Sequence, residues 1–258
     1  MNPLLDQPAA TPEEIAALEA GMARLVGGDR DVVLVPAEAI LALEAIAASV
    51  AAPGRRALNV VTGPYGAIFG GWLRRGGADV LDLATPFDEV VAPDAVAAAV
   101  ASHRPEVLAI VHAEAATGGT NPMAEIAAIA REAGALLVVD AVSSIGAEPV
   151  PAAQWDADFV AIGGQKSLAG PPTPSAVAVS ERGWALVDAN PHAPRGSSLS
   201  LTDWRDVWIR GDRSAVPGLP SWLDVRAMLA ALDRLETERG DAGEGRLGRA
   251  PVPLVHRR

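Results

Sequence analysis

The 258-residue chain contains one lysine, Lys166, while its other 20 residues of the lysine–arginine class are all arginine. Lys166 lies in a Gly-Gly-Gln-Lys-Ser segment just after an apolar run that ends at Ile162. An amine that can lose its proton can form a Schiff base with an aldehyde, whereas a guanidinium stays charged and cannot. The alternative is a chance lysine on a surface loop of an arginine-biased sequence, and Lys166 alone does not decide between the two.

A carboxylate stands at a comparable position 26 residues earlier. Asp140 ends the apolar run 135–139, so it and Lys166 both follow buried runs. Open α/β sheets bind ligands beyond the carboxyl ends of their strands, and a carboxylate there can keep a pyridine nitrogen protonated. The protonated ring is the electron sink of pyridoxal phosphate chemistry. The alternative for Asp140 is a helix cap or a turn residue.

The elements that must position these residues alternate along the chain. Short apolar runs alternate with Ala-rich helical patterns. Several of these runs are apolar throughout, which is typical of strands buried on both faces and joined by helical crossovers. We therefore predict an α/β fold with a mainly parallel sheet sandwiched by helices. The predicted strands are 32–35, 58–61, 80–83, 107–111, 136–139, 159–162 and 176–179.

Helices are predicted between most of these strands, at 37–52, 66–75, 93–103, 122–133 and 181–188. An amphipathic opening helix is indicated by Thr11-Pro12-Glu13-Glu14, where a capping hydroxyl precedes proline and glutamate. A last helix is expected from Pro220 to Gly240. The sequence thus predicts one large domain over 1–240 and a disordered tail over 241–258, which mixes Gly, Pro and Arg without periodicity.

Composition excludes several classes of function. The net charge of −11 argues against nucleic-acid binding, because neutralising phosphates needs clustered Lys and Arg. The chain has no cysteine, and its four histidines lack metal-ligand spacing, so no metal site is expected. No apolar run reaches the ~18 residues of a membrane span, and the N-terminus has no basic leader segment. We expect a cytoplasmic protein with small-molecule partners.

Three segments carry a resemblance to a known family. Residues 112–118 (HAEAATG), 139–146 (VDAVSSIG) and 163–172 (GGQKSLAGPP) resemble segments of class V aminotransferases and follow one another in the same order. The sequence is most similar to the alanine–glyoxylate and serine–pyruvate branch, over about residues 13–240. The resemblance implies the large domain of the fold type I pyridoxal-phosphate-dependent transferases.

The resemblance also implies roles for five residues. Lys166 would form the Schiff base with pyridoxal 5'-phosphate, and Asp140 would face the pyridine nitrogen. Val142 would lie under one face of the ring, Tyr65 would stack on the other, and Gln165 would contact the phosphate side. The implied activity is amino-group transfer between small amino acids and 2-oxo acids. The alternative for Tyr65 is a core aromatic that begins a helix.

The sequence also departs from the family at several positions. Where relatives bind the phosphate with a Ser-Gly-His type turn, this chain has Pro36-Ala37-Glu38, which brings a carboxylate toward a dianion. Ala115 replaces a serine close to the cofactor. The C-terminal small domain that binds the substrate carboxylate in relatives is expected to be absent. The alternatives are therefore a pyridoxal phosphate lyase, or a degenerate or truncated homologue without catalytic activity.

We also expect a homodimer. Each site of this family lies near the subunit boundary, and a missing small domain would uncover the apolar face of the last helix. That face comprises Leu223, Met228, Leu229 and Leu232. A contiguous apolar patch is rarely left in water, so association with a second copy is predicted.

Overall fold

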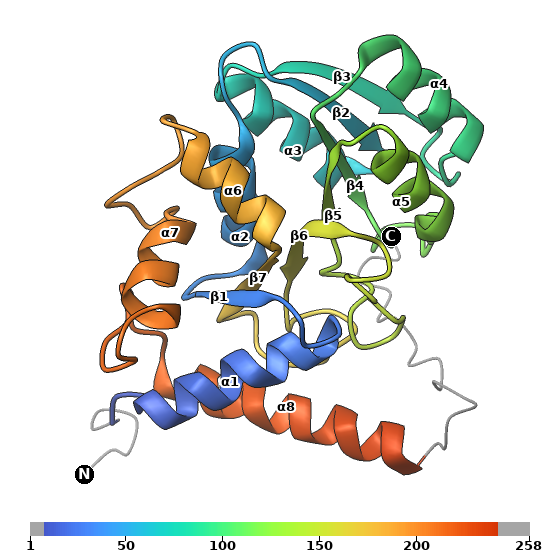
Figure 1. Ribbon diagram of the computed structural model, residues 1–258. Helices are drawn as coiled ribbons and strands as arrows, with labels where there is room; N and C mark the ends of the chain where they lie inside the picture. Colours follow the sequence, from blue (N-terminus) through green and yellow to red (C-terminus); the bar gives the residue numbers. More distant parts are fainter. Residues whose placement is uncertain (1–7, 242–258) are drawn as a thin grey trace.

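The computed structural model describes residues 8–241, which form one seven-stranded sheet with helices on both faces (Figure 1). The spatial order of the strands is β1-β7-β6-β5-β4-β2-β3. β7 runs antiparallel to both of its neighbours, and every other neighbouring pair is parallel. The predicted mainly parallel α/β sheet is confirmed. Its strands are β1 (Asp31–Val35), β2 (Arg56–Val61), β3 (Asp79–Ala84), β4 (Val107–Val111), β5 (Leu136–Asp140), β6 (Ala157–Ile162) and β7 (Ser175–Val179).

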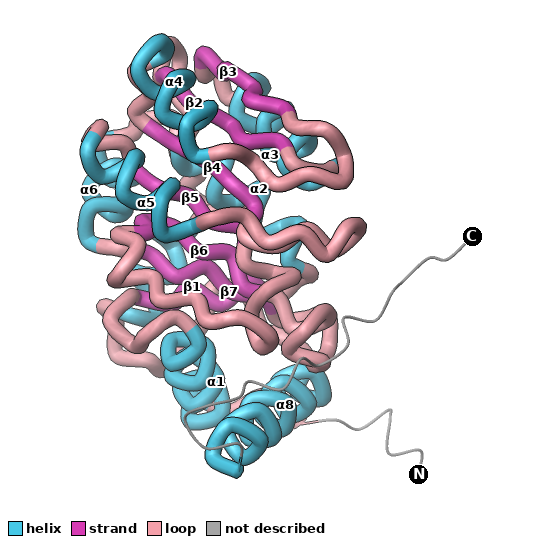
Figure 2. The backbone as a smooth tube through the Cα atoms, turned by 90° about the vertical axis from the view of Figure 1, so that its right-hand side faces the viewer, coloured by secondary structure: helices cyan, strands magenta, loops and turns pink. Residues whose placement is uncertain are grey.

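Helices cover both faces of the sheet, and α1 and α8 pack against each other as a separate pair. The helices α2 and α3 pack on one face of the sheet, and α4 and α5 pack on the other (Figures 1 and 2). None of the helices within residues 8–241 is both long and apolar enough to cross a bilayer. The elements are α1 (Pro12–Leu25), α2 (Ala39–Val50), α3 (Pro64–Arg75), α4 (Pro93–His103), α5 (Met123–Glu132), α6 (Glu181–Ala189), α7 (Leu201–Trp204), the π-helical turn Arg205–Ile209 and α8 (Trp222–Asp241).

Local sequence explains where these elements lie. Every residue of β4, β6 and β7 is buried, as runs that are apolar throughout predict for strands covered on both faces. The helix α1 begins at the predicted capping box, in which Thr11 accepts a hydrogen bond from the Glu14 amide while the Glu14 side chain bonds back to Thr11. Gly134 follows α5 with φ of +69°, the left-handed conformation that glycine adopts without strain.

The pairing of β5 with β6 contains an irregularity that a buried carboxylate repairs. The register shifts between Leu137 and Val138, so that Asp158 of β6 has no partner in the ladder. Its Oδ2 accepts the Leu137 amide at 2.9 Å. Arg182 pairs with the same carboxylate at 2.7 Å, and Ser180 donates to its Oδ1 at 2.7 Å. Asp158 therefore fixes how β5 and β6 are aligned.

The last helix is better covered than the sequence suggested. α8 lies side by side with α1 (Figures 1 and 2), and Met228 and Leu232 are buried while Leu223 remains 42% exposed. The expectation of an uncovered apolar face on α8 is therefore wrong for Met228 and Leu232, because α1 and the loop around Gly164 pack against them. The tail expected after α8 falls at 242–258, outside the described residues.

This packing gives a test of how α8 contributes to stability. Replacing buried Leu232 by alanine removes apolar contacts and leaves a cavity, so Leu232→Ala should lower the free energy of unfolding by about 2–4 kcal/mol in urea denaturation. The matched variant Leu223→Ala, on the exposed side of the same helix, should change it by less than about 1 kcal/mol. Equal losses from the two variants would contradict the observed packing of α8 on α1.

Candidate active site

Asp140 and Lys166 meet at the carboxyl edge of the sheet, as their positions after two apolar runs predicted. Asp140 ends β5 and is in register with Ala161 of β6, and the Lys166 loop leaves the end of β6. The loops after these strands are joined, since the Ser167 hydroxyl donates to the Ser143 carbonyl at 2.7 Å. Gly146, with φ of +98°, passes so close to Leu168 that a Cβ would lie 2.8 Å from its Cα. The two loops therefore form one rigid unit.

The Asp140 carboxyl has an electrostatically unusual environment. Burial is the largest influence and raises its pKa from 3.8 to about 6, against the opposing hydrogen bond from the Val142 amide at 3.0 Å. The nearby carboxylates of Glu114 and Glu38 raise the pKa further, while the Lys166 ammonium lowers it. One ammonium thus faces three carboxyl groups in this site, which leaves a surplus of negative charge.

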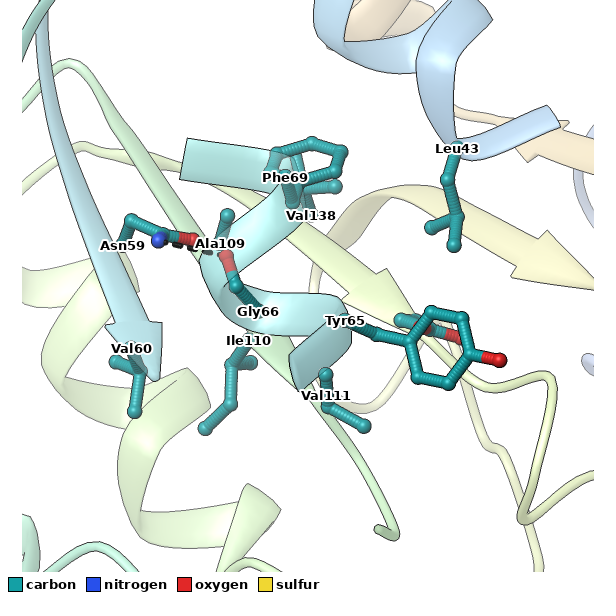
Figure 3. A pocket seen from close by; sticks show the side chains of 11 residues that line it. Leu43, Asn59, Val60, Tyr65, Gly66, Phe69, Ala109, Ile110, Val111 and Val138 are labelled. Carbon is teal, nitrogen blue, oxygen red and sulfur yellow. Dashed lines mark hydrogen bonds between the residues drawn. The ribbon is translucent and has the colours of Figure 1, made fainter. Parts of the chain in front are cut away.

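Two further predicted residues flank the position in front of Asp140. Val142 is buried and packs against Gly163. A Cβ added at Gly163 would lie 2.8 Å from Val142 Cγ1. Tyr65 lies in the first turn of α3 and is 40% exposed. Figure 3 shows its ring pointing away from the pocket residue Asn59, and the same pocket is lined by both Tyr65 and Asp140. The structure thus brings Tyr65, Asp140, Val142 and Lys166 to the same edge of the sheet.

Gln165, the fifth predicted residue, is tied to Glu38. The Gln165 amide donates to Glu38 Oε1, and Glu38 Oε2 accepts the Ile40 amide at 3.1 Å as the cap of α2. The other side-chain atom of the amide, Gln165 Oε1, is buried and has no hydrogen-bond partner among the described residues. The helix N-terminus that binds a phosphate in many proteins is therefore occupied here by a carboxylate of the protein itself.

His112 follows β4 and is buried. Its ring lies edge-on to Trp155 at 5.0 Å between centroids, and burial lowers its pKa from 6.5 to about 4. Its Nδ1 has no hydrogen-bond partner within residues 8–241. The described residues contain no cluster of three or more side chains able to hold a metal ion.

The sequence analysis assigned no role to Glu114. Its side chain is buried, with 4% of its surface exposed, and lies beside Thr62, which directly follows β2. Burial raises the pKa of Glu114, and the hydrogen bond from Thr62 opposes that shift. No spacing rule could have found the pair, because the two residues are 52 positions apart in the chain and meet only when β2 and β4 align.

The site fits one half of pyridoxal phosphate better than the other. A pyridine ring needs a carboxylate, apolar or aromatic neighbours and an amine, and Asp140, Val142, Tyr65 and Lys166 provide them. A phosphate dianion needs N–H donors and positive charge, but Glu38 and the unpartnered Gln165 Oε1 present acceptors instead. The residues at this position suit a hydrogen-bond donor rather than a phosphate.

The match to a family of known proteins covers most of the chain. Residues 10–209 match the model of the family described as aminotransferase class V. The chain belongs to the class V aminotransferases. This family uses pyridoxal phosphate, so the predicted family and its cofactor are confirmed.

Individual relatives show which members this class V chain resembles. It is 38% identical over 212 residues to a pyridoxamine–pyruvate transaminase of Mesorhizobium japonicum, covering 81% of the chain and 53% of the relative. It is 33% identical over 232 residues to a 2-aminoethylphosphonate–pyruvate transaminase of Burkholderia pseudomallei, covering 88% and 61%. The chain thus spans between half and two thirds of the length of these curated relatives.

Solved structures agree with this family assignment. The crystal structure of pyridoxamine-pyruvate aminotransferase from Mesorhizobium loti superposes with a TM-score of 0.82 at 33% identity, covering 90% of this chain and 59% of that one. An alanine–glyoxylate aminotransferase from Nostoc sp. gives a TM-score of 0.84 at 24% identity, covering 90% and 63%. The latter likeness supports the fold, which is the predicted fold type I large domain.

The raised pKa of Asp140 predicts a pH-dependent effect on stability. Above pH 6 the folded protein holds a carboxylate where the neutral acid is favoured, and this cost disappears as the pH falls toward 3.8, the ordinary value. Asp140→Asn keeps the acceptor for the Val142 amide and never ionises. In the absence of cofactor it should therefore be more stable than the parent at pH 8 by about 2 kcal/mol, from the linkage of pKa to stability.

Urea denaturation at pH 8, 6 and 4 measures this difference, which should change little between pH 8 and pH 6 and be largely lost between pH 6 and pH 4. Glu125→Gln, on the exposed surface of α5, controls for the carboxylate-to-amide change itself. A difference that stays constant from pH 8 to pH 4 would show that Asp140 does not titrate as described.

Proposed function

We propose that this chain carries the ring-binding half of an aminotransferase that moves an amino group between a small amine donor and a 2-oxo acid. The observation that supports the proposal most directly is the convergence of the chain's one lysine with Asp140 at the ends of β6 and β5. In the reaction the donor's C–NH2 becomes C=O while the acceptor's C=O becomes CH–NH2. The exchange is balanced and needs no external oxidant.

When bound, pyridoxal supplies an electron sink next to the carbon that loses a proton. The proposed role of Lys166 is to hold the bound pyridoxal through its amine Nζ, which would afterwards be free to accept and return a proton. Asp140 would accept a hydrogen bond from the pyridine nitrogen and favour its protonated form. Tyr65 and Val142 hold the two faces of the ring, since stacking on an aromatic side chain orients a flat ligand.

Covalent trapping tests the role of Lys166. The protein mixed with pyridoxal or pyridoxal phosphate should develop the visible absorption band of a lysine-bound pyridoxal, and borohydride should then fix the label on residue 166 in peptide maps. Lys166→Arg should lose the band completely, because a guanidinium cannot add to the aldehyde. A label found only on the N-terminal amine, or nowhere, would refute the assignment.

One observation favours a narrower donor, which we propose as the second candidate function. The pyridoxamine–pyruvate transaminase of Mesorhizobium japonicum is named for a donor, pyridoxamine, that carries a neutral hydroxymethyl group instead of a phosphate. In this chain the Glu38 carboxylate and Gln165 Oε1 present acceptors at the corresponding end of the site. A hydroxyl can donate to either, whereas a phosphate would be repelled. A donor without a phosphate needs no phosphate-binding turn, so the altered turn at Glu38 is no longer an argument for a degenerate homologue.

Removing the charge of Glu38 tests this candidate. At ~5 Å a carboxylate and a phosphate repel by about 3 kcal/mol per unit charge at an effective dielectric constant of about 20, which corresponds to about two decades of affinity. Glu38→Ser keeps a side chain able to cap α2 and should bind pyridoxal phosphate about a hundredfold more tightly, as measured by absorbance titration. Binding of unphosphorylated pyridoxal should weaken in the same variant.

Glu44→Gln, which removes a carboxylate farther along α2, should leave both affinities unchanged. Unchanged affinity for pyridoxal phosphate in Glu38→Ser would mean that Glu38 does not face the phosphate end of the ligand.

The homodimer and the cytoplasmic location also remain proposals. Because Met228 and Leu232 of α8 are buried, the face of this helix no longer supports the dimer. Other large apolar side chains are exposed. Ile68 of α3 is 43% exposed, and Phe87 and Val90 of the loop between β3 and α4 are 62% and 45% exposed. A second copy of the chain would remove such side chains from water.

A further inference from the structure

The Glu114 carboxyl packs directly on the turn that leads from β2 into α3. Thr62 donates to Glu114 Oε1 at 3.0 Å, and both side chains are buried. At Gly63 a Cβ would lie 2.3–2.6 Å from the two oxygens and the carbon of this carboxyl group, so only glycine leaves room for it. The carboxyl thus occupies the space that a side chain at residue 63 would need.

Glu114 and its partner Thr62 are each held by further hydrogen bonds. Its own loop is closed by two backbone hydrogen bonds, from Glu114 N to the Gly119 carbonyl at 2.9 Å and from Gly118 N to the Glu114 carbonyl at 2.8 Å. On the other side, Asn121 Nδ2 donates to the Thr62 hydroxyl at 3.2 Å and to the Val111 carbonyl at 2.8 Å. Because the Glu114 carboxyl is held in place, it can in turn hold the backbone at Gly63, against which it packs.

The turn that Glu114 touches carries Tyr65. Gly63 is the N-cap of α3 and has no side chain to cap the helix, and Tyr65 follows two residues later. From within the sheet, Asn59 Nδ2 donates to the Gly66 carbonyl at 2.9 Å (Figure 3). The first turn of α3 is therefore held between Asn59 on one side and Glu114 on the other.

We propose that Glu114 is a positioning residue that holds the Thr62–Tyr65 turn in place, so that the Tyr65 ring stands at a fixed distance from Val142. This inference rests on the proposed function, in which a flat ring lies between Tyr65 and Val142. Glu114 acts through Gly63 and Tyr65 and need not touch the ligand. Its removal should loosen the stacking face while leaving Lys166 and Asp140 in place.

A double-mutant cycle tests the coupling between Glu114 and Tyr65. The probe is whichever of pyridoxal and pyridoxal phosphate the parent chain binds more tightly, followed by absorbance and by the circular dichroism of the bound chromophore. Glu114→Ala and Tyr65→Ala should each weaken binding about tenfold, and the double variant should be about as weak as either single one, because residues coupled through one backbone turn are not additive. Glu125→Ala, an exposed carboxylate on α5, should have no effect in either background.

Glu114→Ala should also reduce the circular dichroism of the chromophore at saturating ligand, because the ring is no longer held in one orientation. Additive losses of about a hundredfold in the double variant, with unchanged dichroism at saturation, would overturn the inference while leaving the proposed function intact. A parent chain that binds neither form of the ligand would overturn the proposed function itself, and the inference with it.

Hydrogen exchange without ligand provides a separate readout, also for the case that Glu114→Ala folds poorly. Thr62→Val keeps the shape of the side chain but removes the hydroxyl that donates to Glu114. Amide exchange of Ala67, whose N–H donates to the Gly63 carbonyl at 3.3 Å, should be about tenfold faster in Thr62→Val than in the parent, with little change in the rest of the sheet. Exchange unchanged at this amide would show that the hydrogen bond from Thr62 to Glu114 does not hold the turn, and would overturn the inference.

Discussion

The alignment of β5 with β6 decides whether a site can form, and a single buried carboxylate maintains it. Asp140 ends β5 and the Lys166 loop leaves the end of β6, so a slip of β5 by one residue would move Asp140 along the sheet edge and turn its side chain to the other face. The irregularity at Leu137 makes such a slip possible. Asp158 prevents it by accepting the amide that the ladder leaves free, and Arg182 balances its charge. The Asp158 side chain is buried and the Arg182 side chain is 44% exposed, so the carboxylate holds the alignment from inside while the arginine compensates its charge from the surface.

The strands and helices could be predicted from the sequence because each depends on residues that are close together in the chain. All seven strands and the long helices lie where apolar runs, caps and glycines placed them, and Asp140 and Lys166 were found from their positions at the ends of two runs. A strand end is a local property, and the geometry of parallel sheets then brings two ends together. The buried pair Trp204 and Trp208 likewise follows from their spacing on one helical segment.

The interactions that the sequence did not reveal depend on side chains that are distant in the chain. The sequence already placed the Glu38 carboxylate where relatives bind a phosphate, but its bond with Gln165 joins residues 127 positions apart and follows only from the structure. The face of α8 was misjudged because the apolar stripe of α1 could have packed on the sheet or on another helix. Nothing in either helix alone specifies the pairing that forms, in which Leu232 meets Gly21.

The place of β1 in the sheet has a consequence for the synthesis of the chain. Among the strands of residues 8–241, β1 leaves the ribosome before the others, yet its pairing partner is β7, with Asp31 opposite Val179. Until the segment 175–179 has been made, the run Val32–Val35 has no strand to pair with, and contacts between such distant segments form slowly. An unpaired apolar strand is a template for aggregation, so the nascent chain carries this risk while the segments between β1 and β7 are translated. The same strand leads into the turn that holds Glu38, so this side of the site can be completed only after β7 has been made.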